Sequence, residues 1–231
     1  MTRVTLYYDV VSPWSFMAYV VLKRYRQLWN LQLDLKPMFL GGVMQASGNK
    51  PPITVKNKGL WMNGSDLPLA FDYMKIDFQF PKEFPVNTIQ IMRALRAVQQ
   101  IAPQKLEKAT DAFFEAFWQG KASGLSAAEV AKPAAFPQIL KRDGLFSDAE
   151  VKQISDAMGS DQIKNLVKEE AGKLAVEGGS FGFPWIVVKR DDGKERAFWG
   201  ADRFEMMAYW LGKEWKGPLG DGGKRAVPSK L

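Results

Sequence analysis

The first forty residues alternate between strand and helix patterns, and this opening constrains the fold more than any other part of the chain. Residues 3–10 alternate apolar and polar side chains, which is typical of a half-buried strand. Ser12 and Pro13 follow, and because Ser is a favoured N-cap and Pro a favoured first helical residue, they predict a helix to about Asn30. Residues 31–36 alternate again. The sequence therefore predicts a β-α-β unit with a right-handed crossover.

The rest of the chain divides into a helical middle and an end with strand patterns. Residues 41–83 are rich in Gly, Pro and Asn, which predicts mostly loop with short helical pieces. Residues 87–178 carry helical signals, among them two capping boxes at residues 126–129 and 147–150. Within them, residues 104–119 place apolar side chains along one helical face.

The end of the chain returns to strand patterns. Residues 185–188 and 195–199 flank the turn Asp191-Asp192-Gly193 and predict two paired strands. Asp202 is expected to cap a last helix that runs over residues 203–211 and ends at Gly212. The order β-α-β, helical block, β-β-α is that of a thioredoxin fold with a helical insertion. An unrelated α/β domain with added helices is the alternative that element order leaves open.

Two residue types are absent, and their absence restricts the chemistry. The 231 residues contain no Cys, which excludes disulfides, thiolate nucleophiles and thiolate metal sites. They also contain no His, which removes the usual general base near neutral pH and the commonest metal ligand. Any catalysis must therefore use hydroxyls, carboxylates, Lys, Arg, backbone dipoles or a cofactor.

The formal net charge of +7 suits an anionic ligand, although a solvated basic surface explains it equally well. The positive residues are spread along the chain, so no nucleic-acid partner is expected. No apolar run approaches 18 residues, so no membrane span is expected. The first residues lack the apolar stretch of a signal peptide, so secretion is not expected.

The motif Ser12-Pro13-Trp14-Ser15 lies between the first predicted strand and helix, where thioredoxin-like proteins carry a C-x-x-C pair. A serine hydroxyl is too weak an acid to act alone as a nucleophile, and no His is present to activate it. Together with the helix dipole, it could donate a hydrogen bond to a thiolate that the ligand supplies. The alternative is that Ser12 is only a helix cap.

Two further features lie near the second pair of strands. Phe183-Pro184 precedes a strand, where a thioredoxin fold usually has a cis proline that faces the active motif and leaves the preceding backbone free to pair with a peptide-like ligand. An ordinary strand-initiating proline is the alternative. Residues 200–203, GADR, begin a helix, where backbone N–H groups suit a carboxylate and an Asp suits an ammonium group.

Five motifs occur in register along the chain: YYDVVSPWSF, SGNKPP, Lys58-Gly59-Leu60, FGFP and GADR. Through these motifs the chain resembles the kappa-class glutathione transferases. The resemblance covers nearly the whole chain and implies an α/β, thioredoxin-like fold with a large all-helical insertion domain, the DsbA-like architecture that 2-hydroxychromene-2-carboxylate isomerases share. Residues 1–50 and 180–231 are then expected to form the glutathione-binding domain and residues 51–179 the inserted helical domain.

The resemblance also implies roles for individual residues. Ser12 matches the catalytic serine that hydrogen-bonds the glutathione sulfur. Asn49 and Lys58 match polar residues that reach the tripeptide. Phe183, before Pro184, matches the residue whose backbone pairs with the cysteinyl part.

Asp202 and Arg203 match the residues that hold the γ-glutamyl end, where one contact is expected to cross the interface of a homodimer. Family members often have Ser at the position of Ala201. Because a hydroxyl contact is lost there while the backbone N–H remains, weaker glutathione binding is expected rather than none.

By this resemblance the chain is expected to be a glutathione transferase that activates the thiol of its co-substrate for attack on small hydrophobic electrophiles, with no metal. A glutathione-dependent isomerase of the hydroxychromene-carboxylate type and a non-catalytic glutathione or peptide carrier are the alternatives. Four aromatic residues are candidate walls of the electrophile pocket, each with a place in the core as its alternative: Trp14, Phe16, Trp61 and Phe183.

The sequence ends in Ser229-Lys230-Leu231, which matches the peroxisomal address. Eukaryotic kappa-class proteins tend to end in such tripeptides. Import through the peroxisomal receptor is therefore expected, with a mitochondrial or cytoplasmic location as the alternatives.

Overall fold

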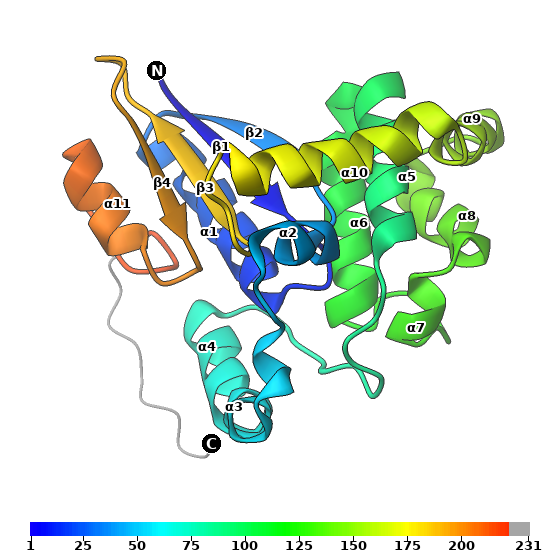
Figure 1. Ribbon diagram of the computed structural model, residues 1–231, viewed down its shortest axis with the longest axis horizontal. Helices are drawn as coiled ribbons and strands as arrows, with labels where there is room; N and C mark the ends of the chain where they lie inside the picture. Colours follow the sequence, from blue (N-terminus) through cyan, green and yellow to red (C-terminus); the bar gives the residue numbers. More distant parts are fainter. Residues whose placement is uncertain (222–231) are drawn as a thin grey trace.

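Strand β1 (Thr2–Tyr8) lies inside a four-stranded sheet with the order β2-β1-β3-β4. It pairs in parallel with β2 (Leu31–Pro37) and antiparallel with β3 (Trp185–Lys189). β4 (Glu195–Trp199) pairs antiparallel with β3. Figure 1 shows this computed structural model, which describes residues 1–221. The mixed sheet, with its strands in two distant parts of the chain, is the predicted thioredoxin-like arrangement.

Side-chain alternation along the strands separates the two faces of the sheet, because successive residues of a strand point to opposite sides. On β3, Ile186 and Val188 belong to the main apolar core, which also contains buried residues of helices α1 (Pro13–Leu28) and α11 (Phe204–Leu211). Trp185 and Val187 belong to a second, smaller cluster with α2 (Leu40–Ser47) and α10 (Asp161–Val176). Helices therefore cover both faces of the sheet.

Helix α1 begins where the sequence predicted. Ser12 is its N-cap, the Ser12 hydroxyl accepts a hydrogen bond from the Ser15 amide at 3.1 Å, and Pro13 is the first helical residue. The cap satisfies one of the amides that the first turn of a helix leaves without a partner. The helix joins β1 to β2, as the predicted β-α-β unit requires.

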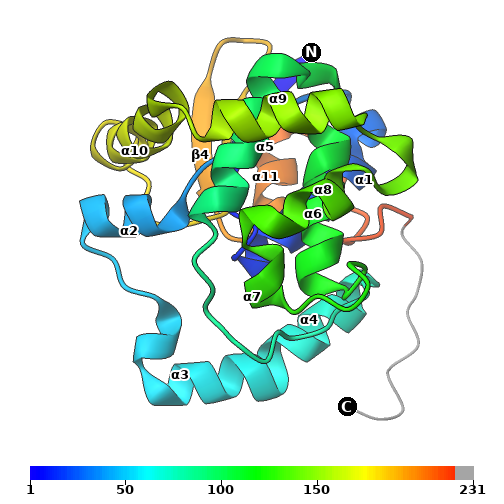
Figure 2. The same ribbon diagram turned by 90° about the vertical axis from the view of Figure 1, so that its right-hand side faces the viewer.

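Residues 56–74 form a nearly continuous helical run, so the prediction of mostly loop for residues 41–83 is wrong. Figure 2 shows the run as one rod along an edge of the molecule. Glycine and proline content is only a local signal, whereas the α4 part of this run is held by burial of Leu67, Phe71 and Met74 against the core. Its parts are α3 (Lys56–Trp61), a π turn (Met62–Asp66) and α4 (Leu67–Met74), preceded by a 3-10 turn (Pro52–Thr54).

The helical middle is confirmed, and both predicted capping boxes are formed, at Ser126 with Glu129 and at Ser147 with Glu150. The apolar face predicted within residues 104–119 is buried. The helices are α5 (Ile89–Ile101), α6 (Leu106–Trp118), α7 (Ala127–Val130), α8 (Phe136–Leu140), α9 (Asp148–Met158) and α10; the 3-10 turns between them are Pro103–Lys105, Pro133–Ala135 and Arg142–Gly144.

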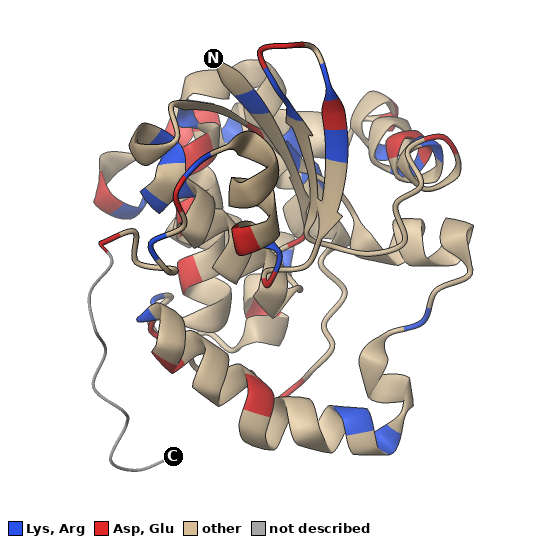
Figure 3. Ribbon diagram, turned by 90° about the vertical axis from the view of Figure 1, so that its left-hand side faces the viewer, with Lys and Arg blue, Asp and Glu red and all other residues tan. Residues whose placement is uncertain are grey.

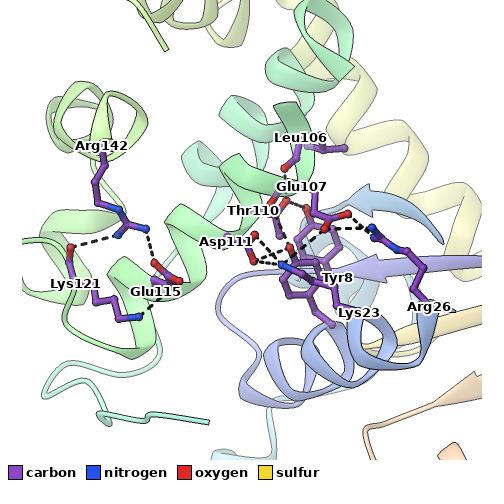
Figure 4. Close-up of polar contacts among 11 residues, drawn as sticks. Tyr8, Lys23, Arg26, Leu106, Glu107, Thr110, Asp111, Glu115, Lys121 and Arg142 are labelled. Carbon is purple, nitrogen blue, oxygen red and sulfur yellow. Dashed lines mark hydrogen bonds and ion pairs between the residues drawn. The ribbon is translucent and has the colours of Figure 1, made fainter. Parts of the chain in front are cut away.

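The helical middle and the sheet share one apolar core. The ring of Phe114, on α6, stacks on Phe16 of α1 with 4.9 Å between centroids. The buried Tyr8 hydroxyl lies 2.6 Å from the Thr110 hydroxyl. Figure 4 shows the ion pairs that join α1 to α6 at the edge of this contact, among them Lys23 with Asp111 at 2.7 Å. The first turn of α1 is therefore packed against α6 through Phe16.

Helix α11 ends at Gly212 in the left-handed conformation (φ 65°), as predicted. The expectation that Asp202 caps this helix is wrong. The N-cap residue is Arg203, which makes no capping bond with its side chain, and Asp202 instead pairs with the Arg203 guanidinium. The Asp202 carboxylate also folds back over Gly200, where a Cβ atom would lie 2.7 Å from Asp202 Oδ1.

Candidate active site

A cavity of about 580 Å³ opens beside the N-terminus of α1. This volume is within the range of about 300–1,000 Å³ that is common for small-molecule sites. Segments far apart in the sequence form its walls: the β1–α1 turn, the start of α2, residues 49–53, parts of the α3 run, residues 84–88, residues 182–183 and Trp199. Four predicted site residues therefore line one cavity, namely Ser12, Asn49, Lys58 and Phe183.

Ser12 is buried at the base of this cavity, where it is both a helix cap and a wall residue. Its hydroxyl donates to the Phe183 carbonyl at 3.1 Å and accepts from the Ser15 amide. A serine hydroxyl has one proton and two lone pairs. In this arrangement the hydroxyl proton is donated to the Phe183 carbonyl and the Ser15 amide occupies one lone pair. One lone pair of the hydroxyl therefore remains for a further donor.

Phe183 and Pro184 are joined by a cis peptide bond, as predicted. Phe183 lines the cavity, while Pro184 is not among the lining residues. The Pro184 carbonyl accepts from the Gly200 amide at 3.1 Å, which ties the cavity edge to the GADR segment. A second cis bond, Phe84–Pro85, also lies in the cavity wall. This bond was not predicted from the sequence.

Asn49 fastens one rim of the cavity to the FGFP segment. Its side-chain amide donates to the Phe181 carbonyl at 2.6 Å, and its side-chain oxygen accepts from the Lys50 amide at 2.8 Å. Gly182 is closely packed in the same segment, because a Cβ there would lie 3.1 Å from Trp199 Nε1 and 3.7 Å from Asn49 Nδ2. A larger residue at this position would require these side chains to shift.

The charge of the cavity is positive. Two lysines, Lys50 and Lys58, line it, and no Asp or Glu of residues 1–221 does. Figure 3 shows the same bias along residues 48–61, which contain Lys and no acidic residue. α1 adds the positive end of its dipole, and its first turn has no acidic residue to offset it. Such a cavity favours an anionic ligand.

Asp202 and Arg203 are exposed and do not line the cavity. Burial, and to a smaller extent the negative charge of Asp202, raise the pKa of the Asp66 carboxyl on the π turn. Asp202 therefore lies close enough to this turn for its charge to act there. Ala201, between Gly200 and Asp202, is buried.

The predicted aromatic walls are half right. Trp14 and Phe183 line the cavity. Phe16 does not, because its ring is buried in the main core against Phe114. Trp61 does not either, and 59% of it is exposed. Apolar walls that sequence reasoning missed include Phe39, Met62, Phe84, Val86 and Trp199.

Two further findings concern residues 1–221. No group of three or more His, Cys, Asp or Glu side chains in this part of the chain could hold a metal ion. None of its helices combines the length and the apolar character needed to cross a membrane.

Known proteins are similar to this chain in sequence and in fold. Residues 3–212 match the DsbA-like thioredoxin domain. Glutathione S-transferase kappa 1 of Homo sapiens is 33% identical over 221 residues, which cover 94% of this chain and 93% of that protein. The protein of the same name from Rattus norvegicus is 33% identical over 219 residues, covering 93% and 92%.

The solved structure of a 2-hydroxychromene-2-carboxylate isomerase superposes with a TM-score of 0.69 at 21% identity, over 91% of this chain and 94% of that one. This likeness concerns the fold, whereas the sequence identity to the kappa proteins extends over almost the full length of both chains. The chain belongs to the DsbA-like thioredoxin family and, within it, to the kappa-class glutathione S-transferases.

Proposed function

We propose that the cavity binds glutathione and activates its thiol as a thiolate for attack on a small hydrophobic electrophile. The observation that carries this proposal is the Ser12 hydroxyl, which lies at the N-terminus of α1 in the wall of a cavity lined by lysines and apolar side chains. The names of the kappa relatives support the same activity.

The proposed activation is an exchange of hydrogen bonds. The Ser12 hydroxyl donates to the Phe183 carbonyl at 3.1 Å. A thiolate is a charged acceptor and forms a stronger hydrogen bond, so the hydroxyl turns its proton toward the sulfur when glutathione binds. The Phe183 carbonyl is then available to a peptide N–H of the cysteinyl part.

The energy required is within reach of these groups. A thiol with an ordinary pKa of about 8.5 needs roughly 2.7 kcal/mol of preferential thiolate stabilisation for a shift of about two units. A charge-assisted hydrogen bond supplies about 1.5–3 kcal/mol, and a helix N-terminus about 0.3–1 kcal/mol. The thiol proton passes to water, and the thiolate then attacks the electrophile, which expels its leaving group as the thioether forms. The apolar walls at Trp14, Phe39 and Met62 would hold the electrophile.

The other proposed contacts place the tripeptide along the cavity. Lys58 would pair with a carboxylate and Asn49 would reach the peptide backbone. Asp202 and Arg203 would hold the γ-glutamyl end. Because these two residues lie outside the cavity wall of one chain, we propose that the site is completed in a homodimer.

Turnover of two substrates and a binding measurement together separate the candidate functions. The protein should accelerate thioether formation between glutathione and 1-chloro-2,4-dinitrobenzene, followed by absorbance, and bind glutathione in calorimetry. Binding without turnover would identify a carrier, and turnover of only a hydroxychromene carboxylate would identify an isomerase. Either result overturns the transferase proposal.

Ala201→Ser is expected to strengthen glutathione binding about fivefold, since it restores one neutral hydrogen bond worth about 1 kcal/mol. Isothermal titration of both proteins measures the change. Ala201→Gly, which adds no hydroxyl, is the control and should not strengthen binding. Equal affinity of the serine variant would remove this position from the γ-glutamyl site.

We also propose import into peroxisomes, because Ser229, Lys230 and Leu231 match the peroxisomal address. This proposal rests on the sequence alone, since the three residues lie outside the described residues. A fluorescent protein fused at the N-terminus should give puncta that coincide with a peroxisomal marker. Deletion of the three residues should make the signal diffuse. A mitochondrial or diffuse signal from the intact fusion would contradict the proposal.

A further inference from the structure

A buried carboxylate lies behind the cavity wall. Asp9 follows the last residue of β1 and is fully buried. Its side-chain oxygens accept three hydrogen bonds, from the Val11 amide at 3.1 Å, the Leu40 amide at 2.8 Å and the Thr88 hydroxyl at 2.6 Å. A buried charge is costly unless such donors surround it, so these three hydrogen bonds are what allow an ionised Asp9 in the interior.

The three donors belong to three different walls of the cavity. Val11 is in the β1–α1 turn, Leu40 is the first residue of α2, and Thr88 is the N-cap residue of α5; all three line the cavity. The backbone carbonyl of Asp9 also accepts from the Ser12 amide at 3.1 Å. One residue therefore connects the Ser12 turn to two walls that come from distant parts of the chain.

The surroundings of Asp9 set the balance between its two protonation states. Burial raises the pKa of Asp9 to about 6. Hydrogen bonds from Thr88, Leu40 and Val10–Val11 favour the charged form and oppose this increase. From β1, the charge of Asp9 also acts on the Tyr8 phenol, whose pKa is raised mainly by burial. α2 and α5 face Asp9 with the Leu40 amide and the Thr88 hydroxyl.

We propose that ionised Asp9 is a positioning residue that holds the three walls and the Ser12 turn in the arrangement that binds glutathione, so that acidification releases the ligand. The charged carboxylate accepts from all of its donors. A protonated carboxyl has an O–H of its own, which points at a donor and leaves it without an acceptor. The inference rests on the proposed function for the identity of the ligand.

The test is the pH dependence of the affinity for S-methylglutathione, measured by calorimetry on the full chain between about pH 5 and 8. This ligand has no titrating thiol, whereas the proposed lowering of the bound glutathione thiol pKa would itself make glutathione affinity depend on pH. Affinity should be nearly constant from pH 7 to 7.5 and fall through about pH 6, reaching roughly tenfold weaker binding at pH 5. By their ordinary pKa values, the carboxyl and amino groups of this ligand do not titrate between about pH 5 and 7. Asp9→Asn should bind weakly, with no acidic fall.

Thermal unfolding will show whether Asp9→Asn folds. If it does not, a second variant still tests the inference. Thr88→Val removes a hydrogen bond that favours ionised Asp9. The acidic fall should then move upward by about half to one pH unit. Asp111→Asn is the control: this carboxylate accepts from Tyr19 and Lys23 and does not line the cavity, so the fall should stay in place.

The outcomes separate this inference from the proposed function. No glutathione binding by the wild type at any pH contradicts the proposed function itself. Binding that shows no acidic fall, or a fall that remains at the same pH in Asp9→Asn and Thr88→Val, overturns the role of Asp9 and leaves the proposed function standing.

Discussion

Replacing Ser12 by Ala is expected to raise the pKa of the bound glutathione thiol by about one to two units, the equivalent of one charge-assisted hydrogen bond. Turnover near neutral pH should fall about 10- to 100-fold and recover partly as the pH rises. The direction follows from the chemistry: a donor at the sulfur favours the thiolate, so its loss favours the thiol. Glutathione affinity should change much less, because the other contacts of the tripeptide remain.

The structure supplies the control for this experiment. Ser12 also caps α1, so Ser12→Ala should reduce stability by about 1 kcal/mol, which thermal unfolding measures separately. Ser15 lies in the same turn, is fully buried, and its hydroxyl has no hydrogen-bond partner. Ser15→Ala should leave the thiol pKa unchanged. Titration of thiolate absorbance with glutathione bound compares the three proteins, and an unchanged pKa in Ser12→Ala would make Ser12 only a cap.

Parts of the fold with strong local signals were predictable from sequence. Ser12-Pro13 marked the start of α1, and Ser126 and Ser147 marked two capping boxes, because a cap is made by residues three positions apart. The run over residues 56–74 was not predictable in this way. Its two glycines and one proline indicate loop, whereas burial of Phe71 and its neighbours packs the α4 part of the run against the core.

The cavity residues also divide into those that local motifs identify and those whose place depends on packing. Ser12, Asn49, Lys58 and Phe183 were identified by motifs and line one cavity. Phe39, Thr88 and Trp199 were missed because their place depends on how distant segments pack. Asp9 was within reach of sequence reasoning, since a carboxylate that follows a strand of buried residues must find donors there. Asp202 was misjudged as a cap because the sequence does not reveal its pairing with Arg203.

Replacing Asp202 by Ala is expected to weaken glutathione binding about 10- to 150-fold, through loss of a charged hydrogen bond of about 1.5–3 kcal/mol to the γ-glutamyl ammonium. Because Arg203, rather than Asp202, is the N-cap residue of α11, stability should change little. Thermal unfolding without ligand tests that statement, and calorimetry measures the affinity. Asp156→Ala on α9, which removes an exposed carboxylate paired with Lys152, is the matched control and should not alter affinity.

The size of the effect also reports on how the site is completed. In one chain the Asp202 side chain is 70% exposed, and an exposed ion pair contributes at most about 1 kcal/mol, equivalent to about fivefold in affinity. A loss of tenfold or more therefore requires that bound glutathione, a second chain or both exclude water from this carboxylate. If a second chain does so, sedimentation at the concentrations used for calorimetry should find a dimer. If Asp202→Ala binds glutathione as tightly as the wild type, the γ-glutamyl site lies elsewhere.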